Sequence, residues 1–202
     1  MNRAKVYGYD PSAPNDSEVE AAFQSAPPEM VAEILDGELF LQPRPRPKHS
    51  LAASNLLTEL NSKFNLGGPR GPDSWIFLIE PELHLGPKPD KVVPDLAGWH
   101  RDRFPSSALA KHAPVGITVR PDWLCEVISP STERRDRGKK MRIYRREGVG
   151  HAWLVNPEAQ TLEVYRLERE RWYFVDTYEG DDEVHAEPFE AMPLPLGTLW
   201  RM

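Results

Sequence analysis

The stretch that decides the fold is DWLCEVISPSTERRDRGKKMRIYRREGVGHAWLVN, residues 122–156. Its first part, 122–129, is an almost continuous apolar run with a single interrupting charge, which is typical of a central strand buried on both faces. Residues 131–148 predict a helix that ends at Gly148, and residues 151–156 predict the next strand. The order strand, helix, strand indicates an α/β domain with a mixed sheet.

Working outward from this unit, the sequence predicts further strands and helices on both sides. The segment VAEILDGELFLQ, at 31–42, predicts a hairpin that turns at Asp36-Gly37. Residues 49–64 carry apolar side chains at helical spacing. Additional strands are predicted at 74–80, 82–85 and 91–99, short helices at 17–26 and 106–112, and a hairpin from 161–167 and 171–178. We expect an N-terminal extension with a short helix over 1–28, followed by one domain over 29–202 that includes the C-terminal hairpin and an acidic tail.

The composition is that of an ordinary globular chain. The 202 residues suffice for one domain, and 40% of them are hydrophobic. No apolar run approaches the roughly 20 residues that a membrane-spanning helix needs, and the first residues show no secretory signal. Cys125 is the single cysteine, so an intrachain disulfide is impossible and a cytoplasmic location is expected. Cys125 itself is expected to be a core residue. The histidines show no zinc-binding spacing.

The charges are distributed unevenly along the chain. The net charge is −6, which argues against indiscriminate binding to nucleic acid. Residues 133–147 nevertheless carry eight basic and three acidic side chains, whereas 179–190 carry six acidic and no basic ones. The basic helix is either a solvated face or a surface that follows phosphates, in which case Arg134, Arg137 and Arg142 are the expected contacts with nucleic acid.

Two carboxylates interrupt otherwise apolar strands. Glu126 lies inside WLCEVIS, and Asp95 follows Pro94 in KVVPDLAGW. Removing a carboxylate from water costs several kcal/mol unless it is paired, so each must meet a cation or bind a metal. Two such groups on adjacent strands would suit Mg²⁺. The alternative is a buried ion pair or an end-of-strand turn without a metal.

The predicted helix supplies a positive charge near Glu126. Asp136, Lys140 and Tyr144 are spaced four residues apart and share one helix face. Because the helix follows the strand after a short turn, its first turns stay near the C-terminal end of that strand, where sites in α/β proteins usually form. The alternative is a surface salt bridge between Asp136 and Lys140 that contributes little.

The ordered motifs VVPDLAGW, PDWLCEVISPST and DRGKKMRIYRREGVGHAWLVNP resemble the Uma-two family of bacterial endonucleases, whose members are assigned to the PD-(D/E)XK nuclease superfamily. The upstream DGEL at 36–39 and His49 also fit that family's pattern, and the resemblance spans about residues 30–167. It implies a restriction-endonuclease-like α/β fold, with a central mixed sheet flanked by helices. His49 either has a modest structural role at the start of its helix, which we favour, or lines the cleft.

The resemblance also implies a set of site residues. Asp95 matches the Asp of the PD motif and Glu126 matches the second acidic residue. The superfamily has a lysine two residues beyond the second acid, where this chain has Ile128. Lys140 from the following helix matches the lysine that substitutes for it in this family, with Lys139 as the nearby alternative.

The implied activity is Mg²⁺- or Mn²⁺-dependent hydrolysis of phosphodiester bonds in DNA. Asp95, Glu126 and the backbone carbonyl of Val127 would hold the ion, which polarises the phosphoryl oxygen and activates water. Lys140 would orient that water and offset developing charge. A homodimer would suit double-strand cutting. The alternative function is a catalytically inactive nuclease fold that acts as a binding or regulatory module, which the net charge and Ile128 favour.

Overall fold

The computed structural model describes residues 16–66, 74–87, 89–110, 113 and 115–201. The helices are α1 (Asp16–Gln24), α2 (Pro47–Asn61), α3 (Glu133–Arg135), α4 (Met141–Arg146) and α5 (Gly197–Trp200), with π-helical segments η1 (Ser62–Leu66) and η3 (Asp136–Lys140) and a 3₁₀ turn η2 (Ser106–Leu109). The strands are β1 (Met30–Leu35), β2 (Glu38–Pro43), β3 (Trp75–Ile79), β4 (Leu83–Leu85), β5 (Asp90–Val92), β6 (Leu96–His100), β7 (Trp123–Val127), β8 (His151–Asn156), β9 (Thr161–Glu168), β10 (Arg171–Glu179), β11 (Glu183–Val184) and β12 (Leu194–Pro195).

A six-stranded mixed sheet forms the centre of the fold, in the order β10-β9-β8-β7-β6-β3. Only β7 and β8 in this sheet are parallel, and the helical segment between them makes the crossover. Every residue of β7 is buried, as its apolar run predicts. The predicted α/β fold with a central mixed sheet and flanking helices is therefore confirmed.

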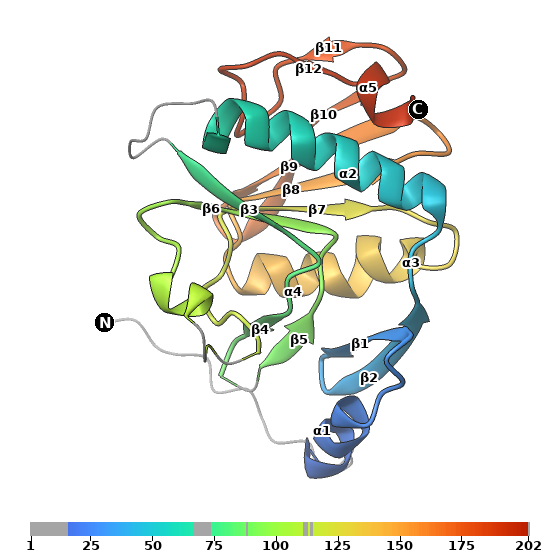
Figure 1. The fold of residues 1–202 in the computed structure, drawn as a ribbon, viewed down its shortest axis with the longest axis vertical. Helices are drawn as coiled ribbons and strands as arrows, with labels where there is room; N and C mark the ends of the chain where they lie inside the picture. The colour runs from blue at the N-terminus through green and yellow to red at the C-terminus, as the bar shows by residue number, and fades with distance from the viewer. Residues whose placement is uncertain (1–15, 67–73, 88, 111–112, 114, 202) are drawn as a thin grey trace.

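Helices cover both faces of this sheet (Figure 1). One face packs against α2 and the C-terminal segment, and the other packs against α4 and the second sheet. Side chains of β7 alternate accordingly: Cys125 and Val127 point to the α2 side, whereas Leu124 points to the α4 side. No described helix is long and apolar enough to cross a membrane.

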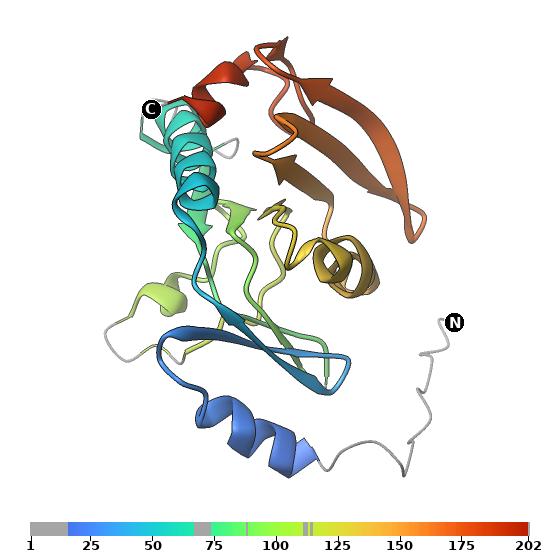
Figure 2. The same cartoon turned by 90° about the vertical axis from the view of Figure 1, so that its right-hand side faces the viewer.

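A second, four-stranded sheet has the order β2-β1-β5-β4 and lies at the end of the molecule that also carries α1 (Figure 2). Its β1–β2 hairpin turns at Asp36 and Gly37, as predicted, with positive φ angles of 52° and 78°. Two consecutive residues in this conformation match the twist of the flanking strands, and glycine adopts it without strain.

The prediction of one strand over 91–99 is wrong. The chain forms β5 in the four-stranded sheet and β6 in the six-stranded sheet, and residues 93–95 cross between them. Pro94 lies at the crossing, where it has no N–H to donate to a ladder and interrupts the strand pairing. The break leaves Asp95 at the seam between the two sheets, immediately before β6.

The helix predicted over 131–148 is present but is not uniformly α-helical. It runs through α3, the π-helical segment η3 and α4. Gly148 has a φ of +78° just past its end, and the next residue, Val149, donates its N–H to the Tyr144 carbonyl. Single π turns within α-helices often occur at functional sites, and here that turn contains Lys140.

The C-terminal segment packs against the sheet as part of the core. Between β11 and β12 the Phe189 ring contacts five aromatic rings, those of Phe64, Trp75, Phe77, Trp123 and Trp153. The predicted β9–β10 hairpin and the short N-terminal helix are both present. Residues 1–15 of the predicted extension, and residues 111–112 of the helix predicted near 106–112, lie outside the described residues.

Candidate active site

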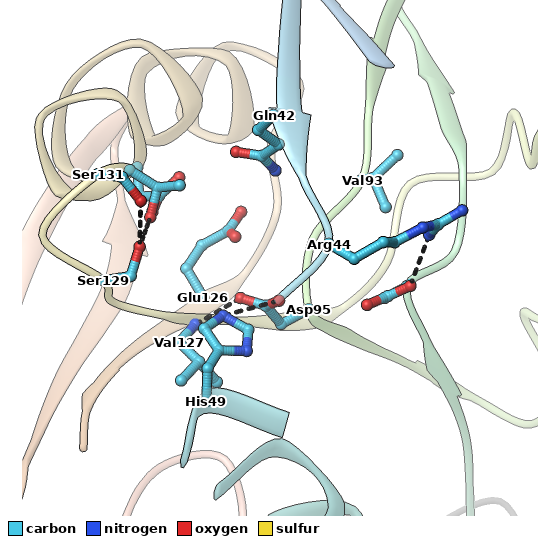
Figure 3. Close-up of polar contacts among 12 residues, drawn as sticks. Gln42, Arg44, His49, Val93, Asp95, Glu126, Val127, Ser129 and Ser131 are labelled. Atoms are coloured by element: carbon cyan, nitrogen blue, oxygen red, sulfur yellow. Dashed lines mark hydrogen bonds and ion pairs between the residues drawn. The ribbon is translucent and has the colours of Figure 1, made fainter. Parts of the chain in front are cut away.

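Asp95 is held between the end of β7 and the start of α2. Its Oδ2 atom accepts a hydrogen bond from the Val127 backbone N–H at 2.6 Å, and its Oδ1 atom lies 3.2 Å from His49 Nε2 (Figure 3). The pairing of Leu96 with Cys125 in the sheet brings Asp95 next to the Glu126–Val127 peptide. Two elements far apart in sequence therefore fix the orientation of this carboxylate.

Glu126 is almost completely buried near the end of β7. Lys140 Nζ donates to its Oε2 atom at 2.9 Å, and the Tyr144 hydroxyl donates to its Oε1 atom at 2.5 Å. Burial raises the pKa of Glu126 well above its usual value, and the positive charge of Lys140 opposes that rise. Both donors come from the α3–α4 helical segment, on the face that the four-residue spacing predicts.

Lys140 reaches Glu126 from the π-helical turn and is 1% exposed. Its ammonium lies within hydrogen-bond distance of Glu126, of Glu33 Oε1 at 3.1 Å and of the Val93 carbonyl at 3.1 Å. Burial lowers the pKa of Lys140, but the surrounding carboxylates outweigh this effect and raise the pKa above its usual value. The alternative of a surface salt bridge between Asp136 and Lys140 is therefore wrong, since both side chains are buried.

Glu33 in β1 belongs to the same cluster, and we did not predict it. Its side chain is fully buried, and its Oε1 atom accepts the Val93 N–H at 2.9 Å. Its Oε2 atom has no hydrogen-bond partner among the described residues. This atom lies 3.7 Å from the Nε atom of Arg135, and that nitrogen also has no hydrogen-bond partner in the described part of the chain. The sequence contained the signal, because Glu33 interrupts the apolar strand VAEIL as Glu126 interrupts its own strand.

The cluster contains more acidic than basic groups. Four carboxylates, of Glu33, Asp95, Glu126 and Asp136, surround the ammonium of Lys140. Burial raises the pKa of Asp136, which reflects the cost of keeping a further negative charge here. Arg135 and His49 lie at the edge of the cluster. The excess of carboxylates favours the binding of an additional cation.

The donor set fits Mg²⁺ or Mn²⁺ better than it fits zinc. No group of three or more His, Cys, Asp or Glu side chains in the described part of the chain is arranged to hold a metal. Mg²⁺ is usually bound through only one or two carboxylates and keeps several waters. Asp95 and Glu126 supply two carboxylates on one cleft, which meets that requirement.

The cleft has a volume of about 700 Å³. Asp95, Glu126 and Lys140 contribute to its lining, so the three predicted catalytic residues meet in one place. One wall is the segment after β2, and the other is the loop that joins β7 to α3. Together with adjoining positions, these walls comprise residues 41–46, 48–49, 128–132 and 157–158.

The three arginines predicted to contact nucleic acid lie in different surroundings. Arg134 and Arg142 are exposed. Arg137 is held by Glu163, with hydrogen bonds of 2.8 and 2.5 Å, and by Glu133 at 2.9 Å, which raises its pKa. None of the three lines the cleft. The cations that do line its walls include Arg44, Arg46 and Lys48, from the proline-rich residues 43–48, for which the sequence analysis predicts no role.

Three neighbouring positions complete the description of the site. Cys125 is fully buried on the opposite face of β7, and burial raises the pKa of its thiol well above the usual value. Ile128 lies just past the end of β7 and lines the cleft. Lys139, one residue from Lys140, points elsewhere and pairs with Glu38. Among the two candidate lysines, only Lys140 contacts Glu126.

Comparison with known proteins identifies a family and a similar solved structure. A family model, Uma2, described as "Putative restriction endonuclease", matches residues 19–196. A crystal structure from Anabaena variabilis ATCC 29413, described as "a putative nuclease belonging to DUF820", superposes with a TM-score of 0.67 at 24% identity. That match covers 88% of this chain and 94% of the other, and at this identity it shows a shared fold. No curated protein matches the chain.

Proposed function

The chain belongs to the Uma2 family of restriction-endonuclease-like proteins, and from this membership we propose that it is a metal-dependent endonuclease that hydrolyses phosphodiester bonds in DNA. The observation that carries the proposal is the contact of 2.9 Å between Lys140 Nζ and Glu126, in a cleft that Asp95 also lines. Two acidic groups and one lysine are the side chains that the superfamily pattern requires, and here the helix provides the ammonium that position 128 lacks.

Asp95, Glu126 and the backbone carbonyl of Val127 would hold Mg²⁺ or Mn²⁺. When bound, the cation would polarise the scissile phosphate and lower the pKa of an attacking water. The excess of buried carboxylates supports this assignment, because a divalent cation would compensate charge that Lys140 alone leaves unbalanced.

The side chains of the site act mainly by holding and compensating charge. The Val127 N–H and His49 fix Asp95, while Tyr144 and Lys140 fix Glu126. Lys140 would also offset the negative charge that develops on the phosphate during hydrolysis. Lys140 already donates hydrogen bonds to Glu126 and to the Val93 carbonyl, and its Nζ atom lies 3.1 Å from Glu33 Oε1. These contacts compete with donation to an attacking water.

The second candidate function is a catalytically inactive binding or regulatory module. The same contacts of Lys140 with Glu126, Val93 and Glu33, together with Ile128 at the usual lysine position, favour it. The two functions differ in whether the site cuts DNA. A homodimer with one site per strand would suit double-strand cutting, and the single buried Cys125 suits the cytoplasm.

Cleavage of supercoiled and linear DNA in Mg²⁺ and in Mn²⁺ tests the proposal, with EDTA as the control. We expect cleavage by the wild-type protein and none by the variants Asp95→Asn and Glu126→Gln. Titration calorimetry with Mn²⁺ should show binding that both substitutions weaken. Metal-independent DNA binding without cleavage, and no Mn²⁺ binding, would instead establish the inactive module.

A further inference from the structure

The chain from the last residue of β2 to the first turn of α2 has the sequence Pro-Arg-Pro-Arg-Pro-Lys, residues 43–48, and we call this segment the strap. We propose that the strap holds one nucleic-acid strand across the cleft by its phosphates, through Arg44, Arg46 and Lys48. This inference rests on the proposed function and names the surface by which DNA would enter that site.

The three cations are placed on the cleft and are accessible. Arg44, Arg46 and Lys48 all line it together with Asp95, and all three are exposed. Figure 3 shows Arg44 on the chain that passes beside Asp95. A strand that follows the strap would therefore pass over the carboxylates that the proposed function requires.

The first two cations of the strap, Arg44 and Arg46, lie on a stiff, extended backbone. Arg46 has extended dihedral angles, φ −77° and ψ 157°, and proline restricts φ at every other position. An extended chain advances about 3.3–3.6 Å per residue, so Arg44 and Arg46 are separated by about 7 Å along the strap. Lys48 follows in the first turn of α2, which begins at Pro47. A separation of about 7 Å is close to the rise of two nucleotides in a stacked strand, at about 3.4 Å each. Little conformational entropy is lost when such a segment binds.

The present partners of these cations can be displaced. Arg44 lies 3.3 Å from Glu80 and Lys48 lies 2.7 Å from Glu158, and all four side chains are at least a third exposed. Exposed ion pairs are weak, so phosphate oxygens can replace the carboxylates. Arg46 has no ion-pair partner among the residues that the structure describes.

The strap is better placed for this role than the basic helix. Arg137 is held in hydrogen bonds to two glutamates, and the exposed Arg134 and Arg142 lie outside the cleft lining. Because the strap offers only cations and prolines, it would contact the backbone and not the base edges. Binding through it is therefore expected to be independent of sequence.

Fluorescence anisotropy of a labelled oligonucleotide tests the strap. Measurements in EDTA on the full chain, over a series of salt concentrations, separate binding from cleavage. Each phosphate contact contributes about 0.7–0.9 to the slope of log K against log salt concentration. The double variant Arg44→Gln/Arg46→Gln should therefore reduce the magnitude of the slope by about 1.4–1.8. Arg46→Lys, which keeps the charge, should retain the wild-type slope.

The matched control is Arg169→Gln/Arg171→Gln, which removes two exposed arginines at the β9–β10 hairpin, away from the cleft. Its slope should equal that of the wild type. The inference is overturned if the strap variant keeps the wild-type slope, or if the slope falls equally in both double variants. It is also overturned if the slope falls only in the variant Arg134→Gln/Arg142→Gln. If the strap variant has a reduced slope but the wild-type protein cuts no DNA, the proposed role of the strap is supported and only the proposed endonuclease activity is rejected.

Discussion

At the scale of single residues, the ammonium of Lys140 is the centre of the buried cluster. It touches two carboxylates and a backbone carbonyl and is shielded from water. Pairing of this kind offsets a desolvation cost that neither partner could meet alone. Lys140 therefore has a structural role whether or not the site is catalytic, and tests of its chemistry must separate the two roles.

We predict that Lys140→Ala lowers the free energy of unfolding by about 3–5 kcal/mol, because it leaves Glu126 and Glu33 buried without a cation. Urea denaturation at neutral pH measures this loss. Lys139→Ala is the matched control, since its ion pair with the exposed Glu38 should contribute only about 0–1 kcal/mol. Equal losses in the two variants would contradict the description of the cluster.

His49 is predicted to orient Asp95, because its Nε2 atom lies 3.2 Å from the carboxylate. His49→Ala should weaken Mn²⁺ binding by about 10–100-fold, the usual effect of removing a partner of a metal ligand. His49→Gln can still donate a hydrogen bond and should retain most of the affinity. Titration calorimetry compares the two with His185→Ala, an exposed position far along the chain. Equal affinities in all three variants would show that His49 has no such role.

Asp95 and Glu126 could be singled out from the sequence because a charge inside an apolar strand is conspicuous, whereas Lys140 is indicated by its helix position and by the family resemblance. Asp95, Glu126 and Lys140 meet on one cleft, and Glu33 could have been found by the same criterion. For His49 the sequence leaves two alternatives, a modest structural role, which the sequence analysis favours, and a position in the lining of the cleft. A histidine near a helix start has no pattern that distinguishes them. The structure places His49 in the lining of the cleft. Its contact with Asp95 arises only when two segments, some 46 positions apart in the chain, come together.

At the scale of elements, hairpins and the crossover helix follow from local pattern, whereas the two-sheet division does not. Alternation and turn residues specify β1–β2 and β9–β10. The switch between sheets at 93–95 depends on the pairing of β5 with β1 and β4. These are tertiary contacts, and Pro94 is compatible with them but does not predict them. The π-helical turn around Lys140 likewise reflects the buried ion cluster more than the intrinsic preference of its residues.

The crossover helix is joined to β9 by an ion pair whose strength should depend on pH. Hydrogen bonds from Arg137 lower the pKa of Glu163 below its usual value near 4.5. The stabilisation is therefore complete above that value and is lost as the pH falls through the lower pKa of the folded state. Glu163→Gln should destabilise the protein at pH 7 and much less at strongly acidic pH.

Urea denaturation at several pH values checks this dependence. Glu168→Gln serves as the control, because Glu168 is half exposed and pairs with Arg166 on the same strand, without linking to the helix. A destabilisation by Glu163→Gln that stays constant from pH 7 to strongly acidic pH would contradict the assigned ion pair.

At the scale of the whole molecule, the aromatic cluster around Phe189 connects the C-terminal segment to the sheet. Phe189→Ala should cost about 3–5 kcal/mol, because its ring contacts five others and leaves a cavity when removed. Chemical denaturation gives the loss, and near-ultraviolet circular dichroism reports the tryptophans. Phe174→Ala, at a ring that is 51% exposed, is the control. A loss no larger than that of the control would exclude Phe189 from the core.

The composition correctly predicts a globular chain, but the packing of its C-terminal segment could not be foreseen. The many acidic residues of 179–190 obscured the buried Val184, Ala186 and Phe189. Their spacing is irregular. Val184 pairs with Leu194 in the following β12, and the Phe189 ring contacts Trp123 and Trp153 far upstream. Tertiary packing thus determines this part of the fold, where local periodicity is weak.

The order in which a ribosome makes the chain gives the Phe189 contact a further consequence. Every strand of the six-stranded sheet is synthesised before residues 184–199, which cover one of its faces. A nascent chain that ends at β10 exposes the tryptophans of that face to water and to other chains. The late arrival of the C-terminal segment therefore delays completion of the core, and the apolar surface exposed during this interval favours aggregation.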